Sequence, residues 1–224
     1  MDQQTHNPDQ ITLAIETAIR GGSLALLRGT DVVAKSTGSE DVSRAEKIIP
    51  SIRQLLASAQ MELDEVEKIA VSRGPGSFTG IRIGIATALG LGKAKDVEII
   101  GVSVLDAIIA SRHNGESLCS AVPMGRNEVA FKFGSNNGEE AADVLGNVMN
   151  LDDFVTFVGQ NRSISIAAHS DMALILNEKL LQTKVIDIGI NMAEFIGLHC
   201  DNVGLRSPFS PIYLRNPKRS NSLF

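Results

Sequence analysis

The sequence has little cysteine, few aromatic residues and no tryptophan. Its 224 residues include two cysteines, Cys119 and Cys200, and neither belongs to a Cys-x-x-Cys pair. Two cysteines are too few for a disulfide framework in a chain of this size, so we expect both to be buried, reduced thiols. Aromatic residues make up 4% of the chain and include one tyrosine, so side chains on which nucleic-acid bases could stack are scarce.

Positive charge is also scarce. The 21 lysine and arginine residues are outnumbered by 26 aspartate and glutamate residues, which gives a net charge of -5 at pH 7. A protein that binds nucleic acid by itself normally presents a basic face. If this chain serves a nucleic acid, we therefore expect another protein to hold it.

Long hydrophobic runs are missing as well. The apolar stretches near residues 89–91 and 99–100 are interrupted by charges and are far shorter than a membrane span. Residues 1–10 are polar and lack the apolar core of a signal peptide. We expect a disordered tail over these ten residues, no membrane-spanning segment and a cytoplasmic protein. The hydrophobic content of 43% is ordinary for a globular fold.

The most distinctive stretch is Arg-Gly-Pro-Gly-Ser-Phe-Thr-Gly-Ile-Arg-Ile-Gly at residues 73–84. The apolar residues 68–72 before it predict a short buried strand, and the proline-free residues after it predict a helix. Ser77 or Thr79 is expected to cap this helix. The loop is either an anion site formed by backbone N–H groups or a tight turn fixed by sterics. It lacks the Gly-Lys-Ser/Thr ending of a P-loop.

Small residues recur every four positions along the predicted helix. The first row, which shares one side of the helix, consists of Gly80, Gly84, Ala88 and Gly92. A second row consists of Ala86, Gly90 and Ala94. Glycine inside a helix costs about 1 kcal/mol relative to alanine, so the first row needs a compensating close contact. That contact is either with the chain's own sheet or with a partner helix. Partner contact predicts that Gly84→Leu folds but associates weakly, whereas own-sheet contact predicts that it unfolds.

The first half of the chain alternates strands and helices. Three short strands are predicted at residues 11–16, 23–27 and 32–36, with glycine-containing turns between them. Ser43 and Glu46 form a capping-box pattern before a helix, and Pro50 indicates a kink or a helix that begins close to it. A strand at residues 97–102 and a helix from Ser103 follow. This order predicts a mixed sheet with helices packed on it.

The second half is less regular. Strands are predicted at residues 118–122, 128–133, 154–158 and 164–168, and helices at residues 172–181 and 191–200. Residues 134–150 are polar and contain a short helical candidate. These elements would fit a reduced copy of the first half, although the sequence itself shows no repeat.

Recognisable catalytic patterns are missing. The histidines include no pair at helical spacing, so a histidine-bound metal is not supported: His6, His113, His169 and His199. No serine lies in a Gly-x-Ser-x-Gly nucleophile signature, which argues against a hydrolase. Arg126, in the turn at residues 124–127, is interpreted as a solvated turn residue.

Residues 74–84 resemble the signature of the bacterial TsaB (YeaZ) proteins of tRNA threonylcarbamoyladenosine synthesis. Flanking segments agree with this family: Leu13–Thr17, Ile48–Pro50, Gly101–Leu105 and Pro211–Arg215. The resemblance implies an α/β fold of the actin/Hsp70/sugar-kinase-like (ASKHA) type, with two lobes of which the second is reduced. The implied boundaries are residues 11–110 for the N-terminal lobe, 111–207 for the smaller lobe and 208–224 for a C-terminal tail.

The resemblance also implies a function. We expect a non-catalytic subunit, without a metal or cofactor of its own, that binds and activates a TsaD-like subunit. That subunit would transfer threonylcarbamoyl to the adenosine next to the anticodon of tRNA. A TsaE-like ATPase would complete the complex, tRNA would be contacted only indirectly, and a homodimer would form when TsaD is absent. The expected partner interface consists of Gly80, Ile81, Arg82, Gly84, Ile85, Ala88, Leu89 and Gly92, together with Ile48, Ile52 and Leu55.

In actin-fold ATPases the first hairpin presents an aspartate and hydroxyl groups to metal and phosphate. The TsaB pattern usually has Asp-Thr-Ser there, whereas this chain has Glu16, Thr17 and Ala18, which removes one hydroxyl. ATP or ADP is expected only at the joint with TsaD, and the candidate contacts are Glu16, Thr17, Gly74, Gly76, Ser77 and Thr79. The alternative function is a stand-alone actin-fold ATPase or phosphotransferase. It requires a complete phosphate hairpin in each lobe, and the sequence shows only the altered first one.

Overall fold

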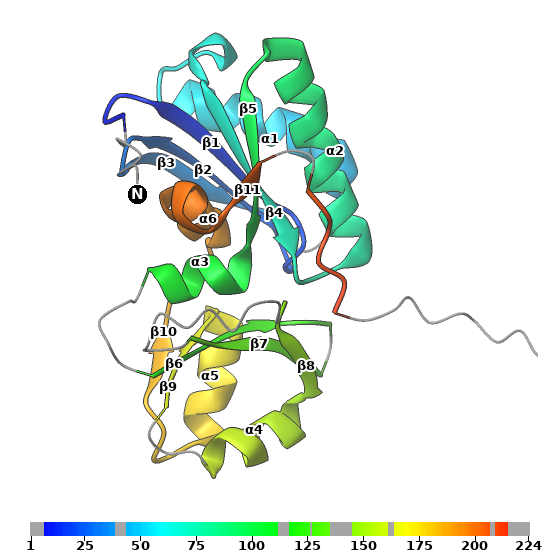
Figure 1. Cartoon of the computed structure of the whole chain (residues 1–224), viewed down its shortest axis with the longest axis vertical. Coiled ribbons are helices and arrows are strands. Elements are labelled where there is room, and N and C mark those ends of the chain that lie inside the picture. Colours follow the sequence, from blue (N-terminus) through cyan, green and yellow to red (C-terminus); the bar gives the residue numbers. More distant parts are fainter. Residues whose placement is uncertain are drawn as a thin grey trace, which may run out of the picture.

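The computed structural model describes residues 7–38, 44–111, 117–125, 127–134, 145–160, 164–206 and 209–214. Within these ranges the chain forms two lobes, one above the other in Figure 1, and each lobe is built on one β-sheet. Most of the tail expected at residues 1–10, and Ser43 of the expected capping box, lie outside the described structure.

The first sheet has six strands in the order β11-β5-β4-β1-β2-β3. They are β1 (Ile11–Glu16), β2 (Ser23–Arg28), β3 (Asp31–Thr37), β4 (Lys68–Gly74), β5 (Glu98–Ser103) and β11 (Leu205–Arg206). β1, β2 and β3 form an antiparallel meander, whereas β4 lies parallel to β1 and β5 lies parallel to β4. β1 and β4 are buried along their whole length, as expected for apolar strands that are covered on both faces.

Two long helices cover one face of the first sheet. α1 (Arg44–Ser58) and α2 (Phe78–Lys95) pack on it through an apolar cluster that includes Leu13, Ile15 and Ile69. Pro50 lies inside α1, so this helix begins before the proline rather than at it. The short 3-10 helix η1 (Leu63–Glu65) leads from α1 to β4.

The second sheet has five strands in the order β10-β9-β6-β7-β8. They are β6 (Leu118–Pro123), β7 (Glu128–Gly134), β8 (Asn147–Asn150), β9 (Ser165–Ala168) and β10 (Val185–Asp187). β6, β7 and β8 form an antiparallel meander, and β9 and β10 run parallel to β6. α4 (Leu151–Gly159) and α5 (Ser170–Lys179) pack on one face. The second lobe therefore repeats the order and directions of β1 to β5 of the first lobe, a repeat that the sequence did not show, whereas β11 has no counterpart among the described strands of the second sheet.

Two helices lie between the lobes, and each packs on the sheet of one lobe although it follows a strand of the other (Figure 1). α3 (Val104–Ala110) follows β5 of the first lobe but packs on the second sheet, whereas α6 (Met192–Val203) follows β10 and packs on the first sheet. One apolar cluster contains residues of both helices and both sheets. Residues 192–206 thus belong to the first lobe, which differs from the boundary expected at residue 207. The physical reason is that the apolar side of α6 covers the second face of the first sheet.

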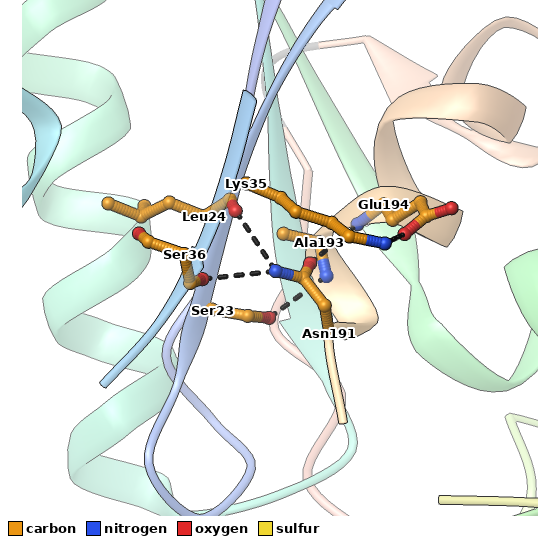
Figure 2. Close-up of polar contacts among 7 residues, drawn as sticks. All are labelled: Ser23, Leu24, Lys35, Ser36, Asn191, Ala193 and Glu194. Atoms are coloured by element: carbon orange, nitrogen blue, oxygen red, sulfur yellow. Dashed lines mark hydrogen bonds and ion pairs between the residues drawn. The ribbon is translucent and has the colours of Figure 1, made fainter. Parts of the chain in front are cut away.

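The N-terminus of α6 is fastened to the first sheet by the side chain of Asn191 (Figure 2). Its Nδ2 donates to the carbonyl oxygens of Leu24 and Ser36 at 3.2 and 3.0 Å, and its Oδ1 accepts from Glu194 N at 3.1 Å. The hydroxyl of Ser23 accepts a hydrogen bond from the neighbouring helical amide, Ala193 N, at 3.0 Å. The chain that returns from the second lobe is therefore capped and held by β2 and β3.

One element of the second lobe differs in type from the expectation. Residues 154–158, predicted as a strand, lie inside α4. The side chain of Asn150 caps this helix by accepting from Asp152 N at 3.0 Å, and the buried residues Leu151, Phe154 and Val158 follow helical spacing. A short apolar run fits either period, so the run alone could not decide. Of the helical candidate at residues 134–150, residues 135–144 lie outside the described ranges, and residues 147–150 form β8.

No described helix is long and apolar enough to cross a membrane.

Candidate functional site

The glycine loop between β4 and α2 is tied to the first hairpin. Gly74 has a φ of 105°, and a Cβ there would lie 2.8 Å from the carbonyl oxygen of Ile212, in the C-terminal segment formed by residues 209–214. Glycine is therefore required at this position. Ser77 caps α2, because its hydroxyl accepts a hydrogen bond from Gly80 N at 3.3 Å. Ser77 N donates to the carbonyl oxygen of Ala18 at 2.8 Å. Of the two expected caps, Ser77 rather than Thr79 fills the position.

The first row of small residues on α2 faces the chain's own sheet. Gly80, Gly84, Ala88 and Gly92 are all buried. A Cβ on Gly80 would lie 2.1 Å from the carbonyl oxygen of Thr17, and one on Gly84 would lie 2.4 Å from the Thr17 hydroxyl. The row lets α2 approach the end of β1 closely. Expecting these four residues at a partner interface was wrong, because the chain itself covers them.

Other residues of the expected interface are also covered. At most 9% of the surface of each is exposed: Ile48, Ile52, Leu55 and Ile81. Ile85 is half-buried against the same sheet-facing cluster. Only Arg82 and Leu89 have exposed side chains. Apolar periodicity identifies the side of a helix that is covered, and here the cover is the first sheet.

The opposite side of α2 is open to solvent. We define the outer face of α2 as Phe78, Arg82, Ala86, Leu89 and Gly90, all of which are exposed. Nothing lies within 4 Å of the position that a Cβ on Gly90 would take. The guanidinium carbon of Arg82 lies 3.8 Å from the centre of the Phe78 ring. Exposed aromatic and arginine side chains beside small residues are typical of protein–protein interfaces.

The C-terminal segment supports the start of this outer face. Arg73 Nε donates to the carbonyl oxygen of Ser210 at 2.8 Å, and Ile212 N donates to that of Arg73 at 2.7 Å. The rings of Tyr213 and Phe78 have centres 4.9 Å apart, and Arg82 Nε donates to the Tyr213 hydroxyl at 3.4 Å. Burial lowers the pKa of Arg73, which still leaves an arginine charged. The sequence analysis missed Tyr213, for which the only signal was the family match at residues 211–215.

A groove of about 400 Å³ lies between α1 and α2. Its lining includes Ile49, Arg53 and Ala57 of α1 and Leu91 of α2. Ile49 is 39% exposed, so an apolar side chain is available there. Together with the outer face of α2, the groove gives the first lobe a partly apolar surface.

A larger hollow, of about 850 Å³, lies between the lobes. The first hairpin and the glycine loop contribute Ala18, Arg20, Gly76 and Ser77. The β6–β7 turn and the start of α5 contribute Met124, Asn127, Glu128, Asp171 and Met172. The two hairpins therefore face each other across this interlobe cleft, because the second lobe repeats the topology of the first.

Glu16 and Thr17, two of the expected nucleotide contacts, are not among the residues that line this cleft. Glu16 is 1% exposed, and its Oε1 accepts hydrogen bonds from Ala18 N and Ile19 N at 2.5 and 2.8 Å. The Thr17 hydroxyl donates to the carbonyl oxygen of Gly80 at 2.7 Å. These bonds build the hairpin and hold α2. Glu16 and Thr17 also line a separate pocket of about 470 Å³ beside the hairpin, whose lining includes Lys35 of β3 and Lys47 of α1.

Of the other four expected nucleotide contacts, two line the interlobe cleft and two do not. Gly76 and Ser77 line the interlobe cleft. Gly74 is buried, and Thr79 is exposed but is not among the lining residues.

Cys119, Cys200 and His169 serve the fold. Cys119 and Cys200 are buried and unpaired, as expected, and burial raises their pKa to about 12 and about 11, so neither is a ready nucleophile. His169 caps α5, since its Nδ1 accepts from Asp171 N at 3.3 Å. Burial lowers the pKa of His169, which favours the neutral ring that this bond requires. In the part of the chain that is described, no cluster of three or more His, Cys, Asp or Glu residues could hold a metal ion.

Comparison with known proteins finds similarity to proteins that are named for tRNA modification. A family model described as TsaD: tRNA N6-adenosine threonylcarbamoyltransferase matches residues 40–196. The tRNA threonylcarbamoyladenosine biosynthesis protein TsaB of Haemophilus influenzae is 34% identical over 123 residues, covering 53% of this chain and 51% of that protein. The protein of the same name from Escherichia coli is 34% identical over 142 residues, covering 59% and 61%. The chain spans about half the length of the curated relatives that it matches.

Solved structures agree on the fold. YeaZ from Pseudomonas aeruginosa has a TM-score of 0.61 at 21% identity, with 92% of this chain and 100% of that chain covered. A Bacteroides thetaiotaomicron protein with an actin-like ATPase fold has a TM-score of 0.50 at 11% identity and covers 89% of this chain and 99% of its own. At such identities the likeness concerns the fold alone. The two-lobed, actin-like α/β fold expected from the sequence is confirmed.

Proposed function

Because this chain belongs to the TsaB (YeaZ) family, within the wider threonylcarbamoyltransferase family, we propose that it is a non-catalytic subunit in threonylcarbamoyladenosine formation on tRNA. Its proposed role is to bind a TsaD-like subunit and hold it in the conformation that performs the transfer, a population shift through differential binding. A TsaE-like ATPase completes the proposed assembly, and tRNA contacts this chain only indirectly.

The exposed side chains of α2 are the observation that best supports this proposal. Phe78, Arg82 and Leu89 supply aromatic, cationic and aliphatic contacts, while Ala86 and Gly90 leave room for a partner helix to approach closely. Because the buried side of α2 is fixed on the first sheet, little conformational freedom is lost on binding. We propose that the TsaD-like subunit docks on this outer face and in the adjoining groove. Without that subunit, the same face would pair with a second copy as a symmetric dimer.

The internal contacts of the first hairpin favour a non-catalytic role over the alternative, a stand-alone ATPase or phosphotransferase. The repeated topology supplies a second hairpin, but the polar side chains of the first one, Glu16 and Thr17, are buried and engaged within the chain. Any ATP or ADP is therefore proposed to bind at the joint with the TsaD-like subunit, where the partner can supply contacts.

Two exposed leucines provide a matched test of the docking surface. Leu89 on α2 is 43% exposed and Leu174 on α5 is 67% exposed, so an arginine at either position should be tolerated by the fold. Leu89→Arg is expected to weaken binding of the TsaD-like subunit about tenfold or more, as for a loss of about 1.4 kcal/mol. Leu174→Arg should bind as the wild type does. Equal calorimetric affinities for the two variants would reject the proposed face.

Reconstitution tests the non-catalytic role. The chain alone is expected neither to hydrolyse ATP nor to modify tRNA, whereas addition of the TsaD-like and TsaE-like subunits should give threonylcarbamoylated tRNA. With Leu89→Arg, product formation should fall at limiting subunit concentration and recover partly in excess. Turnover above about 1 s⁻¹ by the highly purified chain alone, a typical enzyme rate, would contradict the proposal.

A further inference from the structure

The β1–β2 hairpin has the geometry of an anion site, and it already contains an anion. The N–H groups of consecutive residues Ala18 and Ile19 converge on one atom, Oε1 of Glu16, at 2.5 and 2.8 Å. Successive backbone N–H groups that converge in this way form a concavity that binds anions such as phosphate. Here the carboxylate of Glu16 occupies the concavity, and only 1% of the surface of Glu16 is exposed.

This concavity adjoins the interlobe cleft and is held rigidly beside it. Ala18 lines the cleft, and its carbonyl oxygen accepts from Ser77 N at 2.8 Å. A Cβ on Gly76 would lie 2.7 Å from the Cβ of Ala18, so the glycine loop and the hairpin are in close contact. Turning the two N–H groups toward a ligand in the cleft would disrupt this contact as well as the bonds to Glu16.

The chain has an actin-like ATPase fold, and in actin-fold ATPases the first hairpin presents an aspartate and hydroxyl groups to a metal ion and phosphate. The residues present at the first hairpin do not fit that group. The two loop amides are bonded to Glu16, the Thr17 hydroxyl is bonded to the Gly80 carbonyl at 2.7 Å, and Ala18 has no hydroxyl.

We propose that Glu16 is a built-in substitute for a phosphate group, so that the first hairpin of this chain binds neither inorganic phosphate nor nucleotide phosphates. Because the carboxylate is tethered two and three residues from the amides it accepts from, it competes intramolecularly and at high effective concentration. A free phosphate would have to displace it and leave a carboxylate buried without these bonds. The inference concerns the isolated chain and holds whether or not the proposed docking face is correct.

Two substitutions at one position test this inference. Glu16→Ala removes the tethered anion and leaves the two amides free to bind another. Glu16→Gln keeps an acceptor oxygen at the same distance along the side chain and serves as the matched control. Inorganic phosphate and then Mg·ADP, at millimolar concentrations, are the probes. The readout is the amide NMR signals of Ala18 and Ile19, with thermal melting to verify that each variant is folded.

In the wild-type chain these two signals are expected not to move with phosphate or with Mg·ADP. In Glu16→Ala they should shift and saturate, with an affinity for phosphate at least about tenfold above that of the wild type, one decade in the dissociation constant. Glu16→Gln should respond less than Glu16→Ala.

Saturable shifts of these amides in the wild-type chain would overturn the proposal, and so would a folded Glu16→Ala protein whose amides ignore phosphate. If Glu16→Ala does not fold, hydrogen exchange of the wild-type chain decides. Protected amides at Ala18 and Ile19 that become more exchangeable in Glu16→Gln support the proposal, and unprotected ones refute it. Affinity for the TsaD-like subunit, measured on the same preparations, reports separately on the docking face.

Discussion

The two lobes share one strand order but differ in how they are filled. In the first lobe α1 and α2 are 15 and 18 residues long, whereas the corresponding α4 and α5 have 9 and 10 residues. The buried residues beneath α1 and α2 are aliphatic, apart from Met61. The core of the second lobe is built around Phe131 and Phe154, whose ring centres are 5.0 Å apart. Short helices contribute few side chains, so large aromatic ones fill the smaller lobe.

The difference in helix length also affects which lobe can offer a surface to a partner. A long amphipathic helix has one side for the core and a second side for contacts outside it, and α2 has an open outer face of this kind. The helices of the second lobe are too short to offer a comparable surface. The comparison therefore predicts that partner binding depends on the first lobe, while both lobes contribute to stability.

The largest expected effect is in the aromatic core of the second lobe. Phe154 is fully buried, and Phe154→Ala should lower the free energy of unfolding by about 4 kcal/mol, because it removes a large side chain and leaves a cavity. Leu13→Ala, at an equally buried position of the first lobe, should cost about 3 kcal/mol. Urea denaturation measures both. A cost below about 1 kcal/mol for Phe154→Ala would show that this ring does not support the second lobe.

The two sides of α2 should respond oppositely to the same substitution. Gly84→Leu adds a side chain whose Cβ alone would lie 2.4 Å from the Thr17 hydroxyl, and overpacking of this kind should cost about 3 kcal/mol or unfold the protein. Gly90→Leu enters open space and should leave the melting temperature unchanged or slightly higher, since leucine is the better helix former. Gly90→Leu should instead weaken binding of the TsaD-like subunit. A stable Gly84→Leu protein would contradict the packing described here.

The caps of α3 and α6 offer a third comparison. Ser103 caps α3 by accepting from Asp106 N, so Ser103→Ala should cost about 1 kcal/mol. Asn191 caps α6 and also donates to two strands of the first sheet, so Asn191→Ala should cost about 2 kcal/mol or more. Asn191→Asp keeps the cap but places a carboxylate against the two carbonyl oxygens, and it should not restore stability. Equal costs for Ser103→Ala and Asn191→Ala, measured by denaturant unfolding, would show that the strand contacts contribute nothing.

The smallest expected effect is a pH dependence in the second lobe. Burial lowers the pKa of His169 below its ordinary value of 6.5, although Asp171 and Asp187 act in the opposite direction. Below pH 6.5 His169 is therefore protonated in the unfolded chain while it stays neutral in the folded chain. Its contribution to the free energy of unfolding is complete above pH 6.5 and is lost as the pH falls. His169→Asn, which keeps a capping oxygen, should reduce the slope of stability against pH below 6.5 by at most about 1.4 kcal/mol per pH unit. His199 shifts in the same direction, so some slope should remain. An unchanged slope would mean that His169 titrates normally in the folded chain.

Much of the first lobe could be predicted from local patterns. The strand at residues 68–72, the glycine loop and the helix after it were recognisable because buried strands, turn glycines and helical spacing each leave a local signal. The second lobe was harder, since short apolar runs such as Phe154–Val158 fit either a strand or a helix and only the cap at Asn150 decides. The assignment of Gly84 and Ala88 to a partner interface failed for a related reason: a stripe of small residues shows that something approaches closely, but not what approaches.

The sequence by itself determined the family signature, the buried and unpaired state of both cysteines, and the rigid strand–loop–helix unit at residues 68–95. These depend on interactions between residues close in the chain or on composition. Only the tertiary structure decided that α3 and α6 exchange lobes, that Tyr213 stacks beside Phe78, and that the outer rather than the inner side of α2 is available to a partner. The physical reason is that contacts between distant residues are selected by how whole elements pack, and a pattern within one element describes its own two sides without identifying what will cover either of them.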